Sequence, residues 1–161
     1  MIVHPFEPVC GDRAHTLILG TFPSVRSRAE GFYYGHPRNR FWAVLAAVYG
    51  VPVPESIPDK RTLLISRGLA LWDVLASCEI TGSADASIRD AVPNDIPGLA
   101  ARAGIRRILA NGQTAGRLYA RAGFPFPCTV LPSTSPANAA WSLAALAEIW
   151  AQALCPDARD P

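Results

Sequence analysis

Twelve consecutive residues, Gly31 to Trp42 (GFYYGHPRNRFW), concentrate side chains that could hold a polar ligand. They include two tyrosines, one histidine, two arginines and one asparagine. Aromatic rings stack on flat heterocycles, a carboxamide both donates and accepts hydrogen bonds, and guanidinium groups bind phosphate bidentately. This combination suits a site for a nucleobase and its flanking phosphates.

The usual catalytic signatures are missing from the sequence. It contains no Gly-x-Ser-x-Gly elbow, no phosphate loop ending in Gly-Lys-Ser/Thr and no Gly-x-Gly-x-x-Gly turn. The histidines (His4, His15, His36) are too dispersed to indicate a metal site, and the four cysteines stand singly. We therefore expect no metal and no nucleotide cofactor.

Length and composition limit the architecture. The chain has 161 residues, 50% of them hydrophobic, and a formal net charge of +2. These values predict one well-buried domain over residues 1–155, with a frayed tail at 156–161. With no apolar run of about 18 residues and no signal-peptide pattern, we expect a cytoplasmic, nucleoid-associated protein without membrane contact. The basic residues are almost all arginine, which suits phosphate binding, although a GC-rich genome would give the same bias.

Short apolar runs that end in polar or turn residues predict four strands. They lie at 16–20, 69–73, 107–111 and within 126–131. Helical spacing predicts one helix that begins at Asn39 and stops at Gly50, and another that ends near Arg67. Three more helices are predicted at 95–103, 113–122 and 139–154. The polar, proline-interrupted segment from Glu79 is predicted to be a long loop.

Strands that alternate with helices predict a three-layer α/β/α fold around a central, mostly parallel four-stranded sheet. Open sheets of this kind bind ligands outside the carboxyl ends of their strands. Four polar segments follow the predicted strands, namely GTFPS, Asp73, Asn111-Gly112 and LPSTSPAN. We therefore expect them to converge on one cleft, although they are distant in sequence.

Five ordered motifs carry a family resemblance: LILGTFPS, GFYYGHPRNRFW, GLALWDVL, ILANG and LPSTSPAN. They resemble the motifs of the uracil-DNA glycosylase superfamily, over most of the chain. Within it, the sequence is most similar to the hypoxanthine-DNA glycosylase family. The resemblance implies an enzyme that flips a deaminated base, hypoxanthine or also uracil, out of double-stranded DNA and hydrolyses its N-glycosidic bond.

The sequence departs from the superfamily at two catalytic positions. Phe22 stands where many members carry Asn or Asp, and Leu131 stands where others carry a histidine that stabilises the leaving base. The resemblance leaves Asn39 as the candidate catalytic residue, with its carboxamide oxygen aligning a water beneath the sugar C1′. The alternative is that Asn39 only caps the helix that begins there.

The resemblance also implies a base-binding set, each member with an alternative. Tyr34 would stack on the flipped base and Asp73 would accept from a ring N–H. Asn111 would donate to the base O6 or hold Asp73. Packing is the alternative for Tyr34, and for one of the pair Tyr33 and Tyr34 it is expected to hold. A cap near Val74 is the alternative for Asp73, and an Asn-Gly turn is the alternative for Asn111. The full expected set is Gly20, Phe22, Tyr34, Asp73 and Asn111.

Contacts to the DNA backbone are expected from hydroxyls and arginines, with a plain proline-rich loop as the alternative for Ser133 and Ser135. The expected set is Ser24, Arg38, Arg40, Ser133 and Ser135. Lys60 is the only lysine, so no obvious amine exists for a Schiff base with the sugar. We therefore expect a monofunctional glycosylase that acts as a monomer.

Three other functions remain open at this point. The first is a mismatch-specific uracil/thymine glycosylase, since those enzymes share the HPxNRFW run. The second is a non-catalytic relative that binds damaged DNA, because two catalytic positions are altered. The third is an unrelated doubly wound domain that binds phosphate at the helix start after NGQT.

Overall fold

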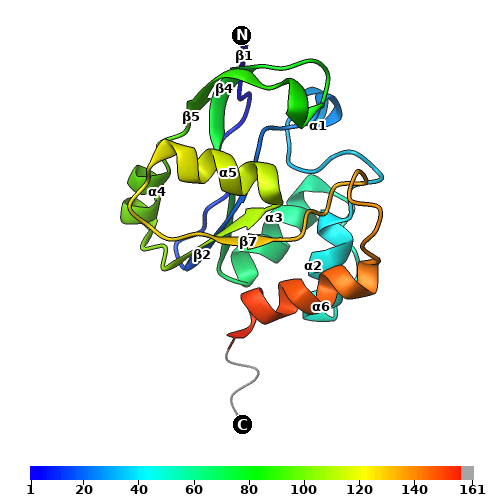
Figure 1. Ribbon diagram of the computed structural model, residues 1–161. Coiled ribbons are helices and arrows are strands. Elements are labelled where there is room, and N and C mark those ends of the chain that lie inside the picture. Colours follow the sequence, from blue (N-terminus) through cyan, green and yellow to red (C-terminus); the bar gives the residue numbers. More distant parts are fainter. Residues whose placement is uncertain (157–161) are drawn as a thin grey trace.

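A four-stranded parallel sheet forms the centre of the protein, of which the computed structural model describes residues 1–156 (Figure 1). The rest of the predicted tail, residues 157–161, lies outside the described residues. The strand order is β3-β2-β6-β7. The strands are β2 (Thr16–Gly20), β3 (Leu69–Asp73), β6 (Arg107–Asn111) and β7 (Thr129–Leu131).

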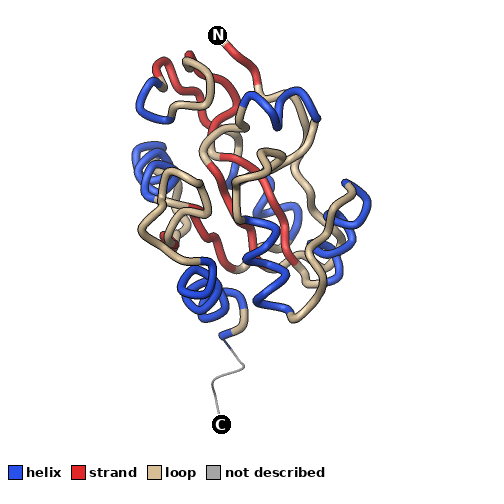
Figure 2. Tube along the Cα trace, turned by 90° about the vertical axis from the view of Figure 1, so that its right-hand side faces the viewer, coloured by secondary structure: helices blue, strands red, loops and turns tan. Residues whose placement is uncertain are grey.

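Helices cover both faces of this sheet, and Figure 2 shows the strands running between them. One core cluster joins the sheet to α2, α3 and α6, and a second joins it to α4 and α5. The predicted three-layer α/β/α architecture is confirmed. The helices are α1 (Val25–Glu30), α2 (Phe41–Tyr49), α3 (Ile57–Ser66), α4 (Ile96–Ala103), α5 (Gln113–Ala122) and α6 (Leu143–Leu154).

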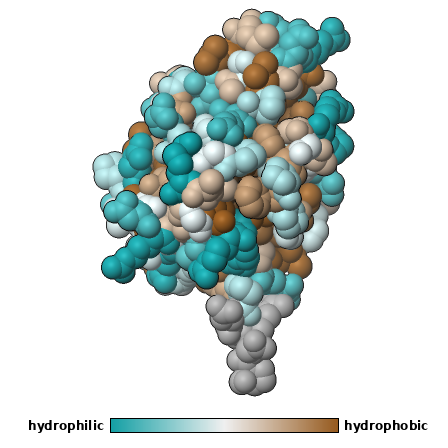
Figure 3. Space-filling model, turned by 90° about the vertical axis from the view of Figure 1, so that its left-hand side faces the viewer, coloured by the Kyte–Doolittle hydropathy of each residue, from teal (hydrophilic) through white to brown (hydrophobic). Residues whose placement is uncertain are grey.

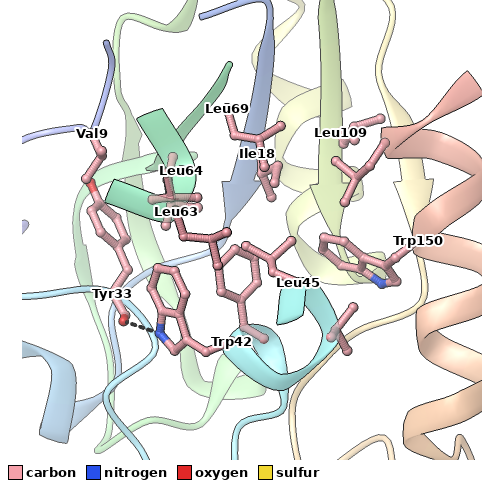
Figure 4. Close-up of a cluster of buried hydrophobic side chains, with 14 of the residues drawn as sticks. Val9, Ile18, Tyr33, Trp42, Leu45, Leu63, Leu64, Leu69, Leu109 and Trp150 are labelled. Carbon is pink, nitrogen blue, oxygen red and sulfur yellow. Dashed lines mark hydrogen bonds between the residues drawn. The ribbon is translucent and has the colours of Figure 1, made fainter. Parts of the chain in front are cut away.

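The face under α2, α3 and α6 is rich in aromatic residues (Figure 4). Trp42 and Trp150 pack there with aliphatic residues of the strands, such as Ile18. Trp42 Nε1 donates to the carbonyl of Tyr33 at 3.2 Å, and the Tyr33 hydroxyl donates to the carbonyl of Glu7 at 2.8 Å. Packing was the alternative for one of the two adjacent tyrosines, and it applies to Tyr33.

The opposite face packs against α4 and α5 through smaller residues. Leu17, Leu19 and Ala110 of the strands meet Ile96 and Tyr119 of the helices there. Successive side chains of a strand point to opposite faces of the sheet, so Ile18 of β2 belongs to the first cluster and its neighbours Leu17 and Leu19 belong to the second. On the molecular surface beside α4, hydrophilic and hydrophobic residues are interspersed (Figure 3).

A second, antiparallel sheet takes one of its strands from the segment that was predicted to be a long loop. It consists of β1 (Ile2–Val3), β4 (Leu75–Glu79) and β5 (Arg89–Pro93), with η1 (Asp85–Ser87) between the last two. All residues of β5 are exposed, so the strand lacks the alternation of apolar and polar residues that identifies a half-buried strand. The loop prediction was wrong for this strand, because β5 is defined by its pairing with β4 and not by a pattern in its own residues.

Helix starts also differ from the predictions. α6 begins at Leu143 rather than near 139, because Ser142 Oγ accepts from the backbone N–H of Ala145 and caps the helix there. The short α1 was not predicted, and it is capped by Ser24. No helix in residues 1–156 combines the length and apolar character needed to cross a bilayer.

Candidate active site

A cavity of about 440 Å³ opens at the carboxyl ends of the central strands. That volume lies in the range of small-ligand sites. The predicted convergence is observed, since the cavity draws on β2, β3, β6 and the loops that follow them. Nine of the predicted site residues line it: Gly20, Phe22, Ser24, Tyr34, Asn39, Asp73, Asn111, Ser133 and Ser135.

Asn39 reaches this cavity just before the start of α2. Its Oδ1 accepts from the backbone N–H of Phe41 at 3.0 Å and from Thr134 Oγ1 at 2.8 Å. The first bond satisfies one of the free N–H groups at the helix start, so the capping alternative holds for the oxygen. An amide oxygen offers two lone pairs, and both are occupied. The expectation that this oxygen aligns a water is therefore corrected: the NH₂ group is the part left for a ligand.

Thr134, which the sequence analysis did not select, links the two asparagines. It is fully buried in the loop after β7. Its backbone N–H donates to Asn111 Oδ1 at 3.0 Å, and Asn111 Nδ2 donates back to its Oγ1 at 3.0 Å. The hydroxyl hydrogen of Thr134 then goes to Asn39. In LPSTSPAN the threonine sits among similar hydroxyl and proline residues, so no local signal distinguished it.

Asn111 has a different role from either one expected. With its oxygen bound to a backbone donor, its Nδ2 must be the donor group. The two Nδ2 hydrogens go to Thr134 Oγ1 and to Tyr34 Oη, the latter at 3.1 Å. Both donors are therefore used inside the protein, and neither is left for Asp73 or a base.

Asp73 at the end of β3 pairs with His4, which the sequence analysis set aside as too isolated. The distance from His4 Nε2 to Asp73 Oδ2 is 2.7 Å, and the side chains are only 4% and 5% exposed. His4 follows β1, 69 residues away in sequence, and reaches Asp73 because β1 pairs with β4. Asp73 was also considered as a cap near Val74, but that N–H donates to the carbonyl of Gly20.

Gly20 permits Asp73 and Tyr34 to approach each other. A Cβ at this position would lie 2.4 Å from Asp73 Oδ1 and 2.7 Å from Tyr34 Oη. Both distances are far below van der Waals contact. Any larger residue would therefore displace the two polar groups that meet at the end of β2.

Tyr34 is held in an uncommon conformation. Its φ of 53° lies in the left-handed region, which costs a non-glycine residue about 1–3 kcal/mol. One ring face stacks on Phe41, with centroids 4.1 Å apart at 22°. Burial, and secondly the charge of Asp73, raise the pKa of the Tyr34 phenol, so its hydroxyl remains protonated.

The two predicted arginines differ in their surroundings. Arg40 donates to the carbonyls of Trp141, Ser135 at 3.2 Å and Asn138 at 3.0 Å. This corrects the view of Arg40 as a phosphate ligand, because its guanidinium holds the loop after β7. The side chain of Arg38 is exposed beside the cavity residue His36.

The predicted serines take part in local turns at the cavity rim. Ser24 caps α1, Ser133 Oγ accepts from the N–H of Ser135, and Ser135 Oγ accepts from the N–H of Ala137. These bonds use acceptor sites and leave the hydroxyl hydrogens of Ser133 and Ser135 to donate. Lys60 lies on α3 with Nζ 5.3 Å from the ring centre of Trp42, and it is not among the cavity-lining residues.

Comparison with known proteins identifies the family. The model of the uracil DNA glycosylase superfamily matches residues 7–154. The chain belongs to this superfamily. The predicted resemblance is confirmed, and with it the class of enzyme, a DNA glycosylase, while an unrelated phosphate-binding domain is excluded.

Several relatives share most of the chain. A hypoxanthine DNA glycosylase of Methanosarcina acetivorans is 33% identical over 145 residues, which cover 88% of this chain and 92% of the relative. A second, from Methanosarcina barkeri, is 32% identical over 113 residues, or 69% of this chain and 72% of the relative. An NMR structure from M. acetivorans, described as a candidate uracil DNA glycosylase, superposes with a TM-score of 0.81 at 32% identity. It covers 96% of this chain and 97% of its own.

Proposed function

We propose that the protein is a monofunctional DNA glycosylase that excises hypoxanthine, and also uracil, from double-stranded DNA and leaves an abasic site. The observation that carries the proposal is the convergence of Asn39, Asp73 and Tyr34 on one base-sized cavity. Relatives named hypoxanthine DNA glycosylase, at 32% and 33% identity, support the choice of base.

The base must leave the duplex to enter such a cavity, because the N-glycosidic bond is shielded inside the stack. The hydroxyls of Ser133 and Ser135 line the cavity, and the exposed Arg38 directly precedes the lining residue Asn39; these groups would bind phosphates. Phe22 would stack on the flipped base, an aromatic contact that contributes about 1–3 kcal/mol. Tyr34, whose hydroxyl lies beside Asp73 Oδ1 above Gly20, would meet the edge of the base rather than its face.

Asn39 would position the attacking water through its NH₂ group. A water that accepts a hydrogen bond from this group keeps a second lone pair for the sugar C1′. The C1′–N bond breaks as positive charge develops on the sugar, water adds to C1′ and loses a proton, and the base anion takes up a proton. A carboxamide takes no proton at neutral pH, so we expect a slower enzyme than one with a carboxylate base.

The remaining properties follow from the proposed reaction. We expect the enzyme to act as a monomer. The position of Lys60 on α3, beside Trp42, supports hydrolysis without a covalent amine intermediate. A substrate of genomic DNA implies an intracellular, nucleoid-associated enzyme.

The proposal is tested on end-labelled duplexes that carry one deoxyinosine, one deoxyuridine or one mismatched thymine. After treatment with the protein and then alkali, a denaturing gel shows cleavage at abasic sites. We expect cleavage of the deoxyinosine strand at a rate lowered about 100-fold or more in Asn39→Ala.

Gln113→Ala, which removes an exposed carboxamide at the start of α5, is the matched control and should keep the wild-type rate. Cleavage of uracil or mismatched thymine alone would identify a mismatch-type uracil/thymine glycosylase instead. Binding to the damaged duplex without release of any base would show a non-catalytic lesion-binding protein.

A further inference from the structure

Two polar groups at the floor of the cavity have complementary hydrogen-bonding roles. We infer that Asp73 Oδ1 as acceptor and the Tyr34 hydroxyl as donor together read the base edge, and that His4 and Asn111 fix these roles from behind. This inference rests on the proposed function and names the chemistry by which the same site selects its base.

The acceptor role of Asp73 follows from the environment of His4. The backbone N–H of Phe6 donates to His4 Nδ1 over a long 3.5 Å contact, which assigns the ring hydrogen to Nε2. Nε2 then donates to Asp73 Oδ2 at 2.7 Å. The second carboxylate oxygen, Oδ1, points to Gly20 at the cavity and keeps its lone pairs for a ligand.

The donor role of Tyr34 follows from the network behind it. The N–H of Thr134 fixes the orientation of the Asn111 amide, so Asn111 Nδ2 donates into the Tyr34 oxygen. A phenol whose oxygen already accepts a bond has its own hydrogen left to donate. Since burial keeps the pKa of this phenol above its ordinary value, the hydrogen is present at neutral pH.

The spacing of the two oxygens suits neighbouring groups on one heterocycle. A Cβ added to Gly20 would lie 2.4 Å from Asp73 Oδ1 and 2.7 Å from Tyr34 Oη, so these two oxygens are at most about 5 Å apart. An acceptor beside a donor complements a ring N–H beside a carbonyl, which is the lactam edge of hypoxanthine or uracil. Adenine and cytosine present the opposite pattern, a ring acceptor beside an amino donor.

Deamination converts the amino pattern into the lactam pattern, so this pair would detect the chemical change itself. A carboxylate facing the ring nitrogen of adenine would place lone pair against lone pair, and a site built for one pattern rejects the other strongly. Guanine shares the lactam edge with hypoxanthine and differs by its 2-amino group, which this pair does not contact.

His4 is in this view a positioning residue that acts through Asp73. It is enclosed by aromatic rings, with centroids 4.7 Å from Phe6, 5.9 Å from Phe22 and 6.0 Å from Tyr33. Because the ring is packed on several sides, it can hold the carboxylate in one orientation. A phenylalanine would keep the packing and lose the N–H donor, and a glutamine would keep a donor at similar reach.

The experiment compares single-turnover release of two bases from otherwise identical duplexes. One duplex carries deoxyinosine and the other deoxynebularine, a purine without the carbonyl and without the ring N–H. We expect His4→Phe to lower the inosine-to-nebularine rate ratio about tenfold or more, and His4→Gln to restore most of it. Tyr34→Phe, which removes only the hydroxyl, should lower the same ratio.

His15→Gln is the matched control, because His15 lies at the amino end of β2 and bonds to Thr16, away from the cavity. It should leave the ratio at the wild-type value. Thermal unfolding of each variant shows whether it is folded. Where nebularine release is too slow to measure, competition binding of the uncleavable 2′-fluoro analogues gives the corresponding ratio of affinities, which should change in the same direction.

The outcomes separate the inference from the proposed function. An unchanged ratio in folded His4→Phe, or equal losses on both bases, would overturn the inference and leave the glycosylase proposal intact. If the wild-type protein releases no base from any duplex, the proposed function itself fails. Loss of the ratio in His4→Phe with recovery in His4→Gln supports the role of the His4 donor.

Discussion

The cavity has a charged side and a neutral side, built on different principles. On the charged side, at the end of β3, the carboxylate of Asp73 is paired with His4 through one oxygen. On the neutral side, amide and hydroxyl groups join Asn111, Thr134 and Asn39 in one hydrogen-bonded row. A backbone N–H group donates to the side-chain oxygen at each end of this row, that of Asn111 and that of Asn39.

The two sides leave different things to a ligand. Asp73 keeps a full acceptor oxygen in a nearly dry site, where electrostatic interactions are strong. The neutral network leaves only its peripheral hydrogens, on the NH₂ group of Asn39 and on the Tyr34 hydroxyl. The comparison suggests that Asp73 and the Tyr34 hydroxyl, where the two sides meet, select the base, whereas Thr134 and Asn39 orient the group that acts on any base admitted.

The largest effect that would sharpen this division is expected from Thr134→Val. The substitution keeps the shape and the backbone N–H but removes the hydroxyl that links Asn111 to Asn39. We expect base release to fall about tenfold or more for deoxyinosine and deoxynebularine alike, measured in single turnover. Stability should fall by about 1–3 kcal/mol in chemical denaturation, because a buried amide hydrogen loses its acceptor.

Thr134→Ser restores the hydroxyl and should recover most of the rate. A change in the ratio between the two bases, rather than in both rates, would break the proposed division, because the bond from Thr134 to Asn39 would then take part in selection.

An intermediate effect is expected from the two arginines that flank Asn39 in the sequence, Arg38 and Arg40. Arg40→Met removes the donors to three loop carbonyls, and we expect a loss of about 1–2 kcal/mol in unfolding free energy. Arg38→Met alters an exposed side chain and should leave stability unchanged. It should instead reduce the slope of log affinity for DNA against log salt by about 0.9.

Equal effects of the two arginine variants on stability would contradict the distinction between them. So would a salt slope that changes in Arg40→Met and not in Arg38→Met. Affinity is measured over a series of salt concentrations with one undamaged duplex.

The smallest effect concerns Asp85, which lines the cavity near the charged side. Asp85 is exposed, yet desolvation at the cavity wall, and secondly the charge of Asp73, raise the pKa of its carboxyl above its ordinary value of 3.8. The folded protein therefore disfavours the ionised form, a penalty that is complete above the folded pKa and absent below 3.8. We expect Asp85→Asn to raise the melting temperature slightly at pH 7, and this difference to disappear near pH 3. A lower melting temperature at pH 7 would contradict the prediction.

Local patterns in the sequence were sufficient for the central sheet. The strand predicted at 16–20 corresponds to β2, and the strand predicted at 69–73 corresponds to β3. Such buried parallel strands are short continuous apolar runs, so each can be recognised without its neighbours. The second sheet escaped prediction because exposed β5 has no such run and is defined only by its partner β4.

The sequence by itself determined which segments meet at the cavity, since parallel strands bring their carboxyl ends to one edge. It also determined that Asn39, Tyr34 and Asp73 would be among the groups there. Only the tertiary structure decided their hydrogen-bonding roles. His4 and Thr134 act through contacts 69 and 95 residues distant in sequence, and the free hydrogens of Asn39 and Tyr34 depend on which of their atoms those contacts occupy. A hydrogen-bonding role is a property of the whole network, and no residue type or spacing specifies it.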